Sequence, residues 1–167
     1  MAYLLDANVF IQAKNLQYGF DFCPAFWDWL DHAHDGGRLL SVRHVADELL
    51  AGEDELADWT AEREAHFFVP PDAAVLAASA KVNGWVIAQG YEPAAVNTFM
   101  QVADFWLVAT ALAGQHVVVT HEGASPSFRR IKIPNVCVGL GVEFMTPYQM
   151  LRREGARFVL GASPAPA

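Results

Sequence analysis

Short apolar segments alternate with helical segments along this chain, and this alternation constrains the fold most strongly. Ala2–Asp6, Phe67–Val69 and His116–Thr120 have the length and composition of strands. The segment His116–Thr120 shows no alternation of apolar and polar residues, as expected for a strand buried on both faces. Strands separated by helices indicate a parallel sheet, so we expect a three-layer α/β/α fold with a central, mainly parallel sheet. Val136–Val138 and Val142–Phe144 are later strand candidates.

Helix boundaries are marked by proline, serine and glycine. Pro24 stands at a first helical position and the segment it opens ends before Gly36. Ser41 is expected to cap the following helix, which Gly52 closes. The other expected helices are Glu53–Glu64, Ala73–Gln89, Asn97–Gly114 and Pro147–Arg153.

Length and composition predict one domain. A chain of 167 residues that is 53% hydrophobic can bury one core but is short for two ordinary domains, so we expect one domain over residues 1–160. Residues 161–167 are small and proline-rich, and we expect them to be disordered.

Several features predict a cytoplasmic protein. The N-terminus has no secretory-signal pattern. Cys23 and Cys137 are isolated, which suits buried thiols in a reducing compartment. The most apolar window, Val102–Thr120, contains Asp104, so we interpret it as a core helix and strand and expect no membrane span.

The net charge of −8 argues against non-specific binding to nucleic acid, because Lys and Arg supply most of that affinity. An acidic chain can still act on phosphodiesters when its carboxylates hold divalent cations. Basic clusters are often only solvated faces, so that interpretation stays open for both clusters here. The clusters that could contact a nucleic-acid backbone are Arg129, Arg130 and Lys132, and Arg152, Arg153 and Arg157.

Four carboxylates stand at positions where a charge is unexpected or where a strand ends. Asp6 interrupts the apolar run "LLDANVFI", and Asp104 is the only charged residue in "FMQVADFWLVATALAG". Glu122 follows the strand "HVVVT", and Glu48 lies on the helix after Ser41. In parallel sheets, ligands gather at the carboxyl ends of the strands, where Asp6 and Glu122 are expected.

Each carboxylate also has an ordinary explanation. Asp6 could cap a turn, Glu48 could pair with His44, Asp104 could pair with a buried arginine, and Glu122 could be exposed. If the four converge, carboxylates about 4 Å apart repel by roughly 4 kcal/mol per pair at an effective dielectric near 20. Such a cluster requires a cation, and oxygen ligands favour Mg2+ or Mn2+ over zinc.

The motifs resemble those of the PIN-domain family of metal-dependent ribonucleases, which includes toxins of toxin-antitoxin pairs. "LLDANVFI" is similar to the first-strand motif, "LLSVRHVADELLAG" to the Glu-bearing helix and "ADFWLVATALA" to the third motif. "VVVTHEG" resembles the strand ending in Thr-x-acid, with Glu122 where the family usually has Asp, and "GVEFMTPYQML" resembles the closing strand and helix. The "KIPNVC" segment and the long insertion between Glu48 and Asp104 resemble an uncharacterised PIN-like subfamily, domain of unknown function 4411.

This resemblance implies an endoribonuclease that hydrolyses RNA to a 5′-phosphate and a 3′-hydroxyl. Asn8 and Thr120 would hold the carboxylates or a bound water in place. The resemblance also implies an antitoxin protein as a partner and a possible homodimer. The residues implied as catalytic groups and as ligands of Mg2+ or Mn2+ are Asp6, Glu48, Asp104 and Glu122.

Rival functions come from other classes of protein. "LLDANVF" begins like the Asp-x-Asp motif of haloacid-dehalogenase phosphatases, but Asn8 replaces the second acid. A non-catalytic PIN-like scaffold that binds a partner also stays open. A zinc hydrolase is the third alternative, although its candidate ligands match no compact motif: His44, Glu48, His116 and His121.

An aromatic segment suggests where a partner could bind. "FDFCPAFWDWL" holds more rings than one side of a helix needs for packing, so either all of them belong to the core or some are exposed to a partner. An amphipathic segment of an antitoxin could then lie across the exposed rings. The rings are Phe20, Phe22, Phe26, Trp27 and Trp29.

Overall fold

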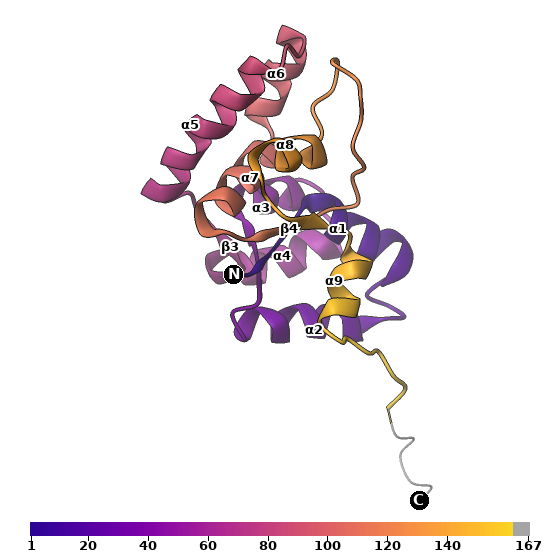
Figure 1. Ribbon diagram of the computed structural model, residues 1–167. Helices are drawn as coiled ribbons and strands as arrows, with labels where there is room; N and C mark the ends of the chain where they lie inside the picture. Colours follow the sequence, from indigo (N-terminus) through magenta and orange to yellow (C-terminus); the bar gives the residue numbers. More distant parts are fainter. Residues whose placement is uncertain (162–167) are drawn as a thin grey trace, which may run out of the picture.

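A parallel sheet forms the centre of the molecule (Figure 1). The structure is a computed structural model that describes residues 1–161. Within those residues five strands pair in the order β3-β2-β1-β4-β5, and every neighbouring pair is parallel. The carboxyl ends of all five strands therefore lie at one edge of the sheet. The strands are β1 (Tyr3–Leu5), β2 (Leu39–Val42), β3 (Phe68–Val69), β4 (Val117–Val119) and β5 (Phe144–Met145).

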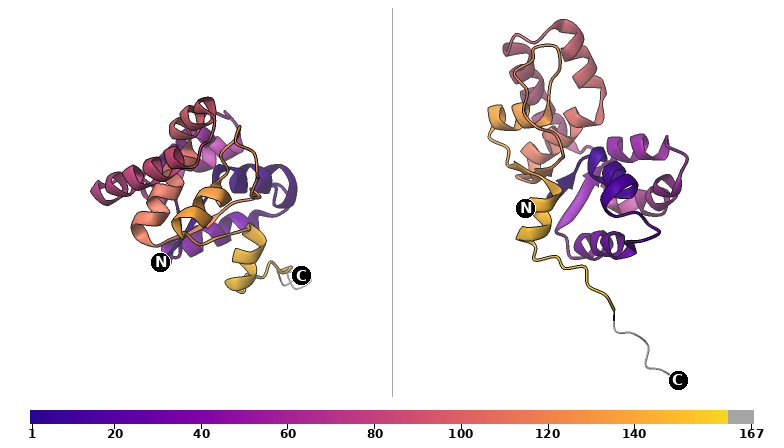
Figure 2. Two further views of the ribbon diagram at one scale, coloured as in Figure 1. Left: turned by 45° about the horizontal axis from the view of Figure 1, so that its top comes forward. Right: turned by 90° about the vertical axis from the view of Figure 1, so that its right-hand side faces the viewer.

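Helices connect the strands and cover both faces of the sheet, which confirms the expected three-layer α/β/α fold. Figure 2 shows α1, α2 and α4 on one side of the sheet and α7 and α8 on the other, with α5 and α6 beyond them. The helical elements are α1 (Ala7–Gln12), the π-helix η1 (Ala13–Gln17), α2 (Pro24–Asp35), α3 (Arg43–Leu50), α4 (Glu55–Phe67), α5 (Ala73–Ala88), α6 (Pro93–Gln101), α7 (Ala103–Gly114), α8 (Ile133–Leu140) and α9 (Pro147–Arg153).

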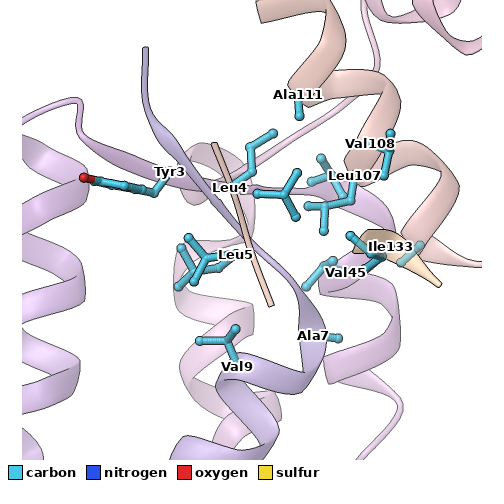
Figure 3. Packing of buried hydrophobic residues seen from close by; sticks show 14 of the residues in the cluster. Tyr3, Leu4, Leu5, Ala7, Val9, Val45, Leu107, Val108, Ala111 and Ile133 are labelled. Carbon is cyan, nitrogen blue, oxygen red and sulfur yellow. The ribbon is translucent and has the colours of Figure 1, made fainter. Parts of the chain in front are cut away.

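The central strand β1 is buried on both faces. Leu4 and Leu5 are fully buried, and the three valines of β4 beside them are at most 1% exposed. Figure 3 shows Leu4 directed toward Leu107 and Val108 of α7, whereas Tyr3 points to the other side of the strand. Burial from both sides explains why these strands lack polar residues, and it leaves polar chemistry to the residues just beyond the strand ends.

The aromatic segment around α2 lies mostly in the core. Phe26 and Trp27 are 1% and 3% exposed, and Phe20 and Trp29 are half-buried against the core. Phe22 is the exception, with 64% of its surface exposed. One exposed ring does not form the continuous aromatic surface that an antitoxin segment would need there.

Ser41 corrects the predicted start of the third helix. We expected it to cap the helix, but it belongs to β2, and α3 begins at Arg43. The buried Ser41 hydroxyl donates a hydrogen bond of 2.6 Å to the carbonyl oxygen of Leu5. A serine whose hydroxyl is bonded to the neighbouring strand fits inside a buried sheet, so its polarity did not mark a helix end here.

Two further segments differ from the sequence-based expectation. Val136–Val138 was a strand candidate, but it lies in α8, which has a proline in its first turn. The expected single helix Asn97–Gly114 is two helices, because Val102 adopts an extended conformation between α6 and α7. The last strand begins two residues later than expected and ends one residue later, at Phe144–Met145.

The helices are short relative to the thickness of a membrane. Within residues 1–161 no single helix is long and apolar enough to cross one; α6 and α7 meet the criterion only as a pair, and they are bent by 71° at their junction. Of the two cysteines, Cys137 is buried and burial raises its thiol pKa to about 12, whereas Cys23 is half-buried. Of the tail predicted to be disordered, residues 162–167 lie outside the described residues.

Candidate functional site

Asp6 and Thr120 stand where the central strands β1 and β4 end. Asp6 is 4% exposed, and its Oδ2 accepts a hydrogen bond of 2.7 Å from the Thr120 hydroxyl. The same hydroxyl accepts hydrogen bonds from the Asn8 side-chain amide, at 3.1 Å, and from the Glu122 backbone N–H, at 3.0 Å. The Asn8 carbonyl in turn accepts from the backbone N–H of His121. This network fixes one carboxylate oxygen of Asp6 and joins two strand ends.

Burial makes the ionised form of Asp6 unfavourable. Desolvation and the nearby charges of Asp104 and Glu122 raise its pKa from 3.8 to about 7, although the Thr120 hydrogen bond acts in the opposite direction. A carboxyl group with a pKa near neutrality is typical of functional sites, because structural carboxylates usually obtain a partner that lowers their pKa.

A pocket of about 400 Å³ lies next to this network. Glu48, Asp104 and Glu122 line it, whereas Asp6 is not one of the lining residues. The structure therefore gathers three of the four predicted carboxylates at one pocket, and the pKa effect between Asp6 and Asp104 places the fourth close by.

Asp104 lies in the first turn of α7, and Glu48 comes from α3. Burial, Glu122 and Glu48 raise the pKa of Asp104 to about 6, and burial raises the pKa of Glu48. Within residues 1–161 neither side chain forms an ion pair, and neither forms a hydrogen bond with another residue. The suggested pair between Glu48 and His44 does not form, because the His44 ring stacks on Trp106 at a centroid distance of 4.7 Å.

Glu122 has a different environment. Its Oε1 lies 2.5 Å from the ammonium of Lys132, and its Oε2 accepts a hydrogen bond of 3.0 Å from the backbone N–H of Ile133. The Glu122 and Lys132 side chains are only 14% and 18% exposed. Glu122 is therefore not exposed, and the ammonium of Lys132, which was expected to contact an RNA backbone, contacts this carboxylate.

Arg129 and Arg130 remain at the pocket. They lie on the loop between β4 and α8, which extends as far as the start of α6 (Figures 1 and 2). There the Glu92 backbone N–H donates a hydrogen bond of 2.9 Å to the Phe128 carbonyl. Arg129 is 83% exposed and pairs with Glu92 at 3.2 Å; Arg130 forms no ion pair within residues 1–161. In the second basic cluster, Arg153 pairs with Glu143 across the end of β5.

The remaining wall of the pocket comes from α6 and from the segment before α8. Sequence reasoning missed these residues, because nothing in their spacing indicates that α6 turns back over the carboxylates. The prolines that open α6 and α8 are the signal that could have placed a helix end near the pocket. The wall residues are Ala94, Ala95, Thr98, Phe99, Val102 and Ile131.

The histidines of the zinc alternative do not converge. His116 precedes β4, where its Nδ1 accepts a hydrogen bond from the Ala2 backbone N–H, and His121 follows the other end of that strand. Five residues of extended chain span roughly 16 Å. Two ligands so far apart cannot share one zinc ion with His44 and Glu48.

The donor set suits a hard cation in its chemistry. Within residues 1–161 the carboxylates of Asp6, Glu48 and Asp104 form no ion pair. Burial raises the pKa of all three, and neighbouring carboxylates raise it further for Asp6 and Asp104. Bound Mg2+ or Mn2+ offsets both effects. As the side chains stand, no group of three His, Cys, Asp or Glu residues within 1–161 has the geometry to hold a metal ion.

Comparisons with known proteins place the chain by fold and family. No curated protein matches it. Among solved structures, it is similar to the crystal structure of FitAcB from Neisseria gonorrhoeae, with a TM-score of 0.53 and 19% sequence identity over 87% of this chain and 98% of that chain. This likeness supports a PIN-like fold. Residues 3–158 match the family described as "Domain of unknown function (DUF4411)". Because that match spans nearly the whole chain, the protein belongs to the DUF4411 family.

Proposed function

We propose that this protein is an Mg2+- or Mn2+-dependent endoribonuclease that hydrolyses RNA phosphodiester bonds and acts as the toxin of a toxin-antitoxin pair. The observation that carries the proposal is the group of carboxylates without an ion-pair partner, Glu48 and Asp104 at the pocket and Asp6 close to Asp104. A soluble domain does not normally collect buried carboxylates without cationic partners unless a ligand supplies the missing charge.

Three residues of the chain would hold the ion: Asp6, Glu48 and Asp104. Thr120 and Asn8 would keep Asp6 oriented through the hydrogen bonds described above. When bound, a divalent cation supplies a Lewis acid for the scissile phosphate and lowers the pKa of an attacking water.

The cationic rim would position the substrate. Arg130 lines the same pocket as Asp104, and within residues 1–161 it has no acidic partner, so its guanidinium is available for a backbone phosphate. Arg129 would add a weaker contact because it is exposed and already paired with Glu92. The net charge of −8 makes such local attraction necessary, since the protein as a whole repels RNA.

The test is cleavage of single-stranded RNA by the purified chain with Mn2+ or with EDTA. We expect cleavage with Mn2+ only, and background activity for Asp6→Asn. Asp47→Asn is the matched control, because Asp47 neighbours Glu48 in the sequence but is exposed and pairs with Arg43. Full activity in Asp6→Asn would contradict the nuclease proposal, and RNA-independent binding of a partner by an inactive chain would favour the scaffold alternative.

The toxin part of the proposal has its own test. If the chain is a toxin that acts on cytoplasmic RNA, its expression should arrest growth, and co-expression of a small regulator encoded beside it should restore growth. Asp104→Asn should be harmless without the regulator. Growth arrest by Asp104→Asn equal to that of the natural chain would contradict a toxicity based on cleavage. Size-exclusion chromatography with light scattering tests the proposed homodimer.

A further inference from the structure

Glu122 is the one carboxylate at the pocket whose charge the chain itself compensates. Both of its oxygens are occupied, one by the Lys132 ammonium and the other by the Ile133 N–H at the start of α8. Ionised partners and a helix N-terminus both strengthen such hydrogen bonds. Because Glu122 and Lys132 are largely shielded from water, the pair is held more firmly than an ion pair at the surface.

Lys132 also acts on the rest of the cluster. Its ammonium contacts Glu122, and Glu122 lines the same pocket as Asp104 and Glu48. The ammonium therefore occupies a place where positive charge offsets the mutual repulsion of the carboxylates. In a cluster without this lysine, a second metal ion would have to supply that charge.

We propose that Lys132 is a resident cation of the acidic site, that it keeps Glu122 out of the coordination of the divalent ion, and that the chain binds a single such ion through Asp6, Glu48 and Asp104. This inference rests on the proposed function for the presence of Mg2+ or Mn2+. It assigns Lys132 as a positioning residue that acts through Glu122, in place of the RNA-binding role suggested by its sequence neighbours.

The experiment is titration of the metal-free full-length chain with Mn2+, followed by calorimetry and by the electron paramagnetic resonance of free Mn2+. We expect one ion per chain. Asp104→Asn should weaken binding by about tenfold or more, because it removes a ligand. Lys132→Met should release Glu122 to the ion and tighten binding by about tenfold.

The double variant Lys132→Met/Glu122→Gln makes the inference specific. It should return the Mn2+ affinity to within about threefold of the natural chain, since the released carboxylate is gone. Lys132→Arg keeps the charge and should also match the natural chain. Lys81→Met, on the exposed face of α5, is the control for loss of a lysine elsewhere. Two ions bound to the natural chain would overturn the proposal. It would also be overturned if Lys132→Met bound Mn2+ more tightly and the added Glu122→Gln change did not reverse that gain in affinity.

Thermal unfolding in EDTA tests the Lys132–Glu122 pair without metal. Lys132→Met should lower the Tm, and adding Glu122→Gln should recover most of the loss, because the second change removes the carboxylate left unpaired. Purely additive losses would contradict the role of Lys132 as a resident cation.

A natural chain that binds no Mn2+ would overturn the proposed function and the single-ion inference together. One that cleaves RNA but binds two ions would overturn the inference alone.

Discussion

Asp104 and Glu122 line the same pocket but have opposite surroundings. Asp104 has no cationic partner within the described residues, and its pKa rises to about 6 because of burial and its acidic neighbours. Glu122 has both an ammonium and a backbone N–H on its carboxylate. We infer from this difference that closeness to the pocket does not by itself make a carboxylate a metal ligand. A carboxylate that the fold leaves uncompensated is available to a cation, and one that the fold has already paired is not.

The largest expected effect is on RNA cleavage. Asp104→Asn should lower kcat/KM by about 1,000-fold, or about 4 kcal/mol of transition-state stabilisation, because the bound ion loses a ligand. Glu122→Gln should lower it by less than about tenfold, since Lys132 and the Ile133 N–H occupy both oxygens of its carboxylate. The measurement is single-turnover cleavage at saturating Mn2+ for both variants. Equal losses would remove the distinction between the two carboxylates.

In the absence of metal, Asp104→Asn and Glu122→Gln should change the thermal stability of the protein in opposite directions. Asp104→Asn removes a mostly buried charge whose raised pKa disfavours the folded state at neutral pH, so the Tm should rise by about 5 °C for a gain of roughly 2 kcal/mol. Glu122→Gln breaks a shielded ion pair and should lower the Tm by a similar amount, about 5 °C. Differential scanning calorimetry in EDTA measures both. A lower Tm for Asp104→Asn would show that its carboxylate has a structural partner.

The pH dependence of stability tests the carboxylates that have no ion-pair partner, Asp6 and Asp104. Asp6 and Asp104 have pKa values of about 7 and about 6 in the folded chain, above the 3.8 of an ordinary aspartate. Between pH 3.8 and these values the folded state binds protons that the unfolded state does not. The contribution of the two groups to the free energy of unfolding is therefore fully present below pH 3.8 and is lost as the pH rises through their folded-state pKa values.

Thermal unfolding in EDTA at about pH 5 and about pH 8 tests this linkage between protonation and stability, because these two pH values lie on either side of the folded-state pKa values. The natural chain should gain stability at the lower pH relative to the Asp6→Asn/Asp104→Asn variant. Comparison with that variant cancels the histidines, several of which have lowered pKa values and act in the opposite direction. A constant difference between the two chains would contradict the raised pKa values.

The smallest expected effect concerns the two arginines at the pocket. Arg130→Ala should weaken binding of RNA by about threefold, because it removes one backbone phosphate contact. Arg129→Ala should have less effect, since Arg129 is 83% exposed and pairs with Glu92. Fluorescence anisotropy with Asp104→Asn as an inactive background measures both affinities, and the difference should shrink as salt is added. If Arg129→Ala weakened RNA binding more than Arg130→Ala does, Arg129 would be the main phosphate contact in place of Arg130.

The layers of the fold could be predicted because they follow from local pattern. The unbroken apolar run of β4 and the helix-opening prolines at Pro24 and Pro147 mark elements that the structure contains. The prediction failed where a distant partner decides the conformation. Ser41 fits in β2 because its hydroxyl reaches the Leu5 carbonyl, and Ile133 begins a helix whose first N–H is bonded by Glu122.

The same limit applies to the candidate site. The sequence singled out the four carboxylates because charge is unusual in such apolar surroundings. It could not show that Lys132 belongs with Glu122, since ten positions separate them and only the loop after β4 brings them together. The apolar wall from α6 was missed for the same reason, because the break at Val102 that directs α6 over the pocket leaves no polar signal.

The hydrogen bond from the Thr120 hydroxyl to Asp6 makes assembly of the site depend on correct pairing of the strands. This bond forms only when β1 and β4 pair with Leu5 opposite Val119, because a shift of one residue would turn the side chains at the strand ends to the other face. The carboxylate cluster thus depends on correct strand alignment. A misfolded chain with a shifted sheet would lack the assembled site, so the proposed nuclease activity would appear only after the sheet is correctly built.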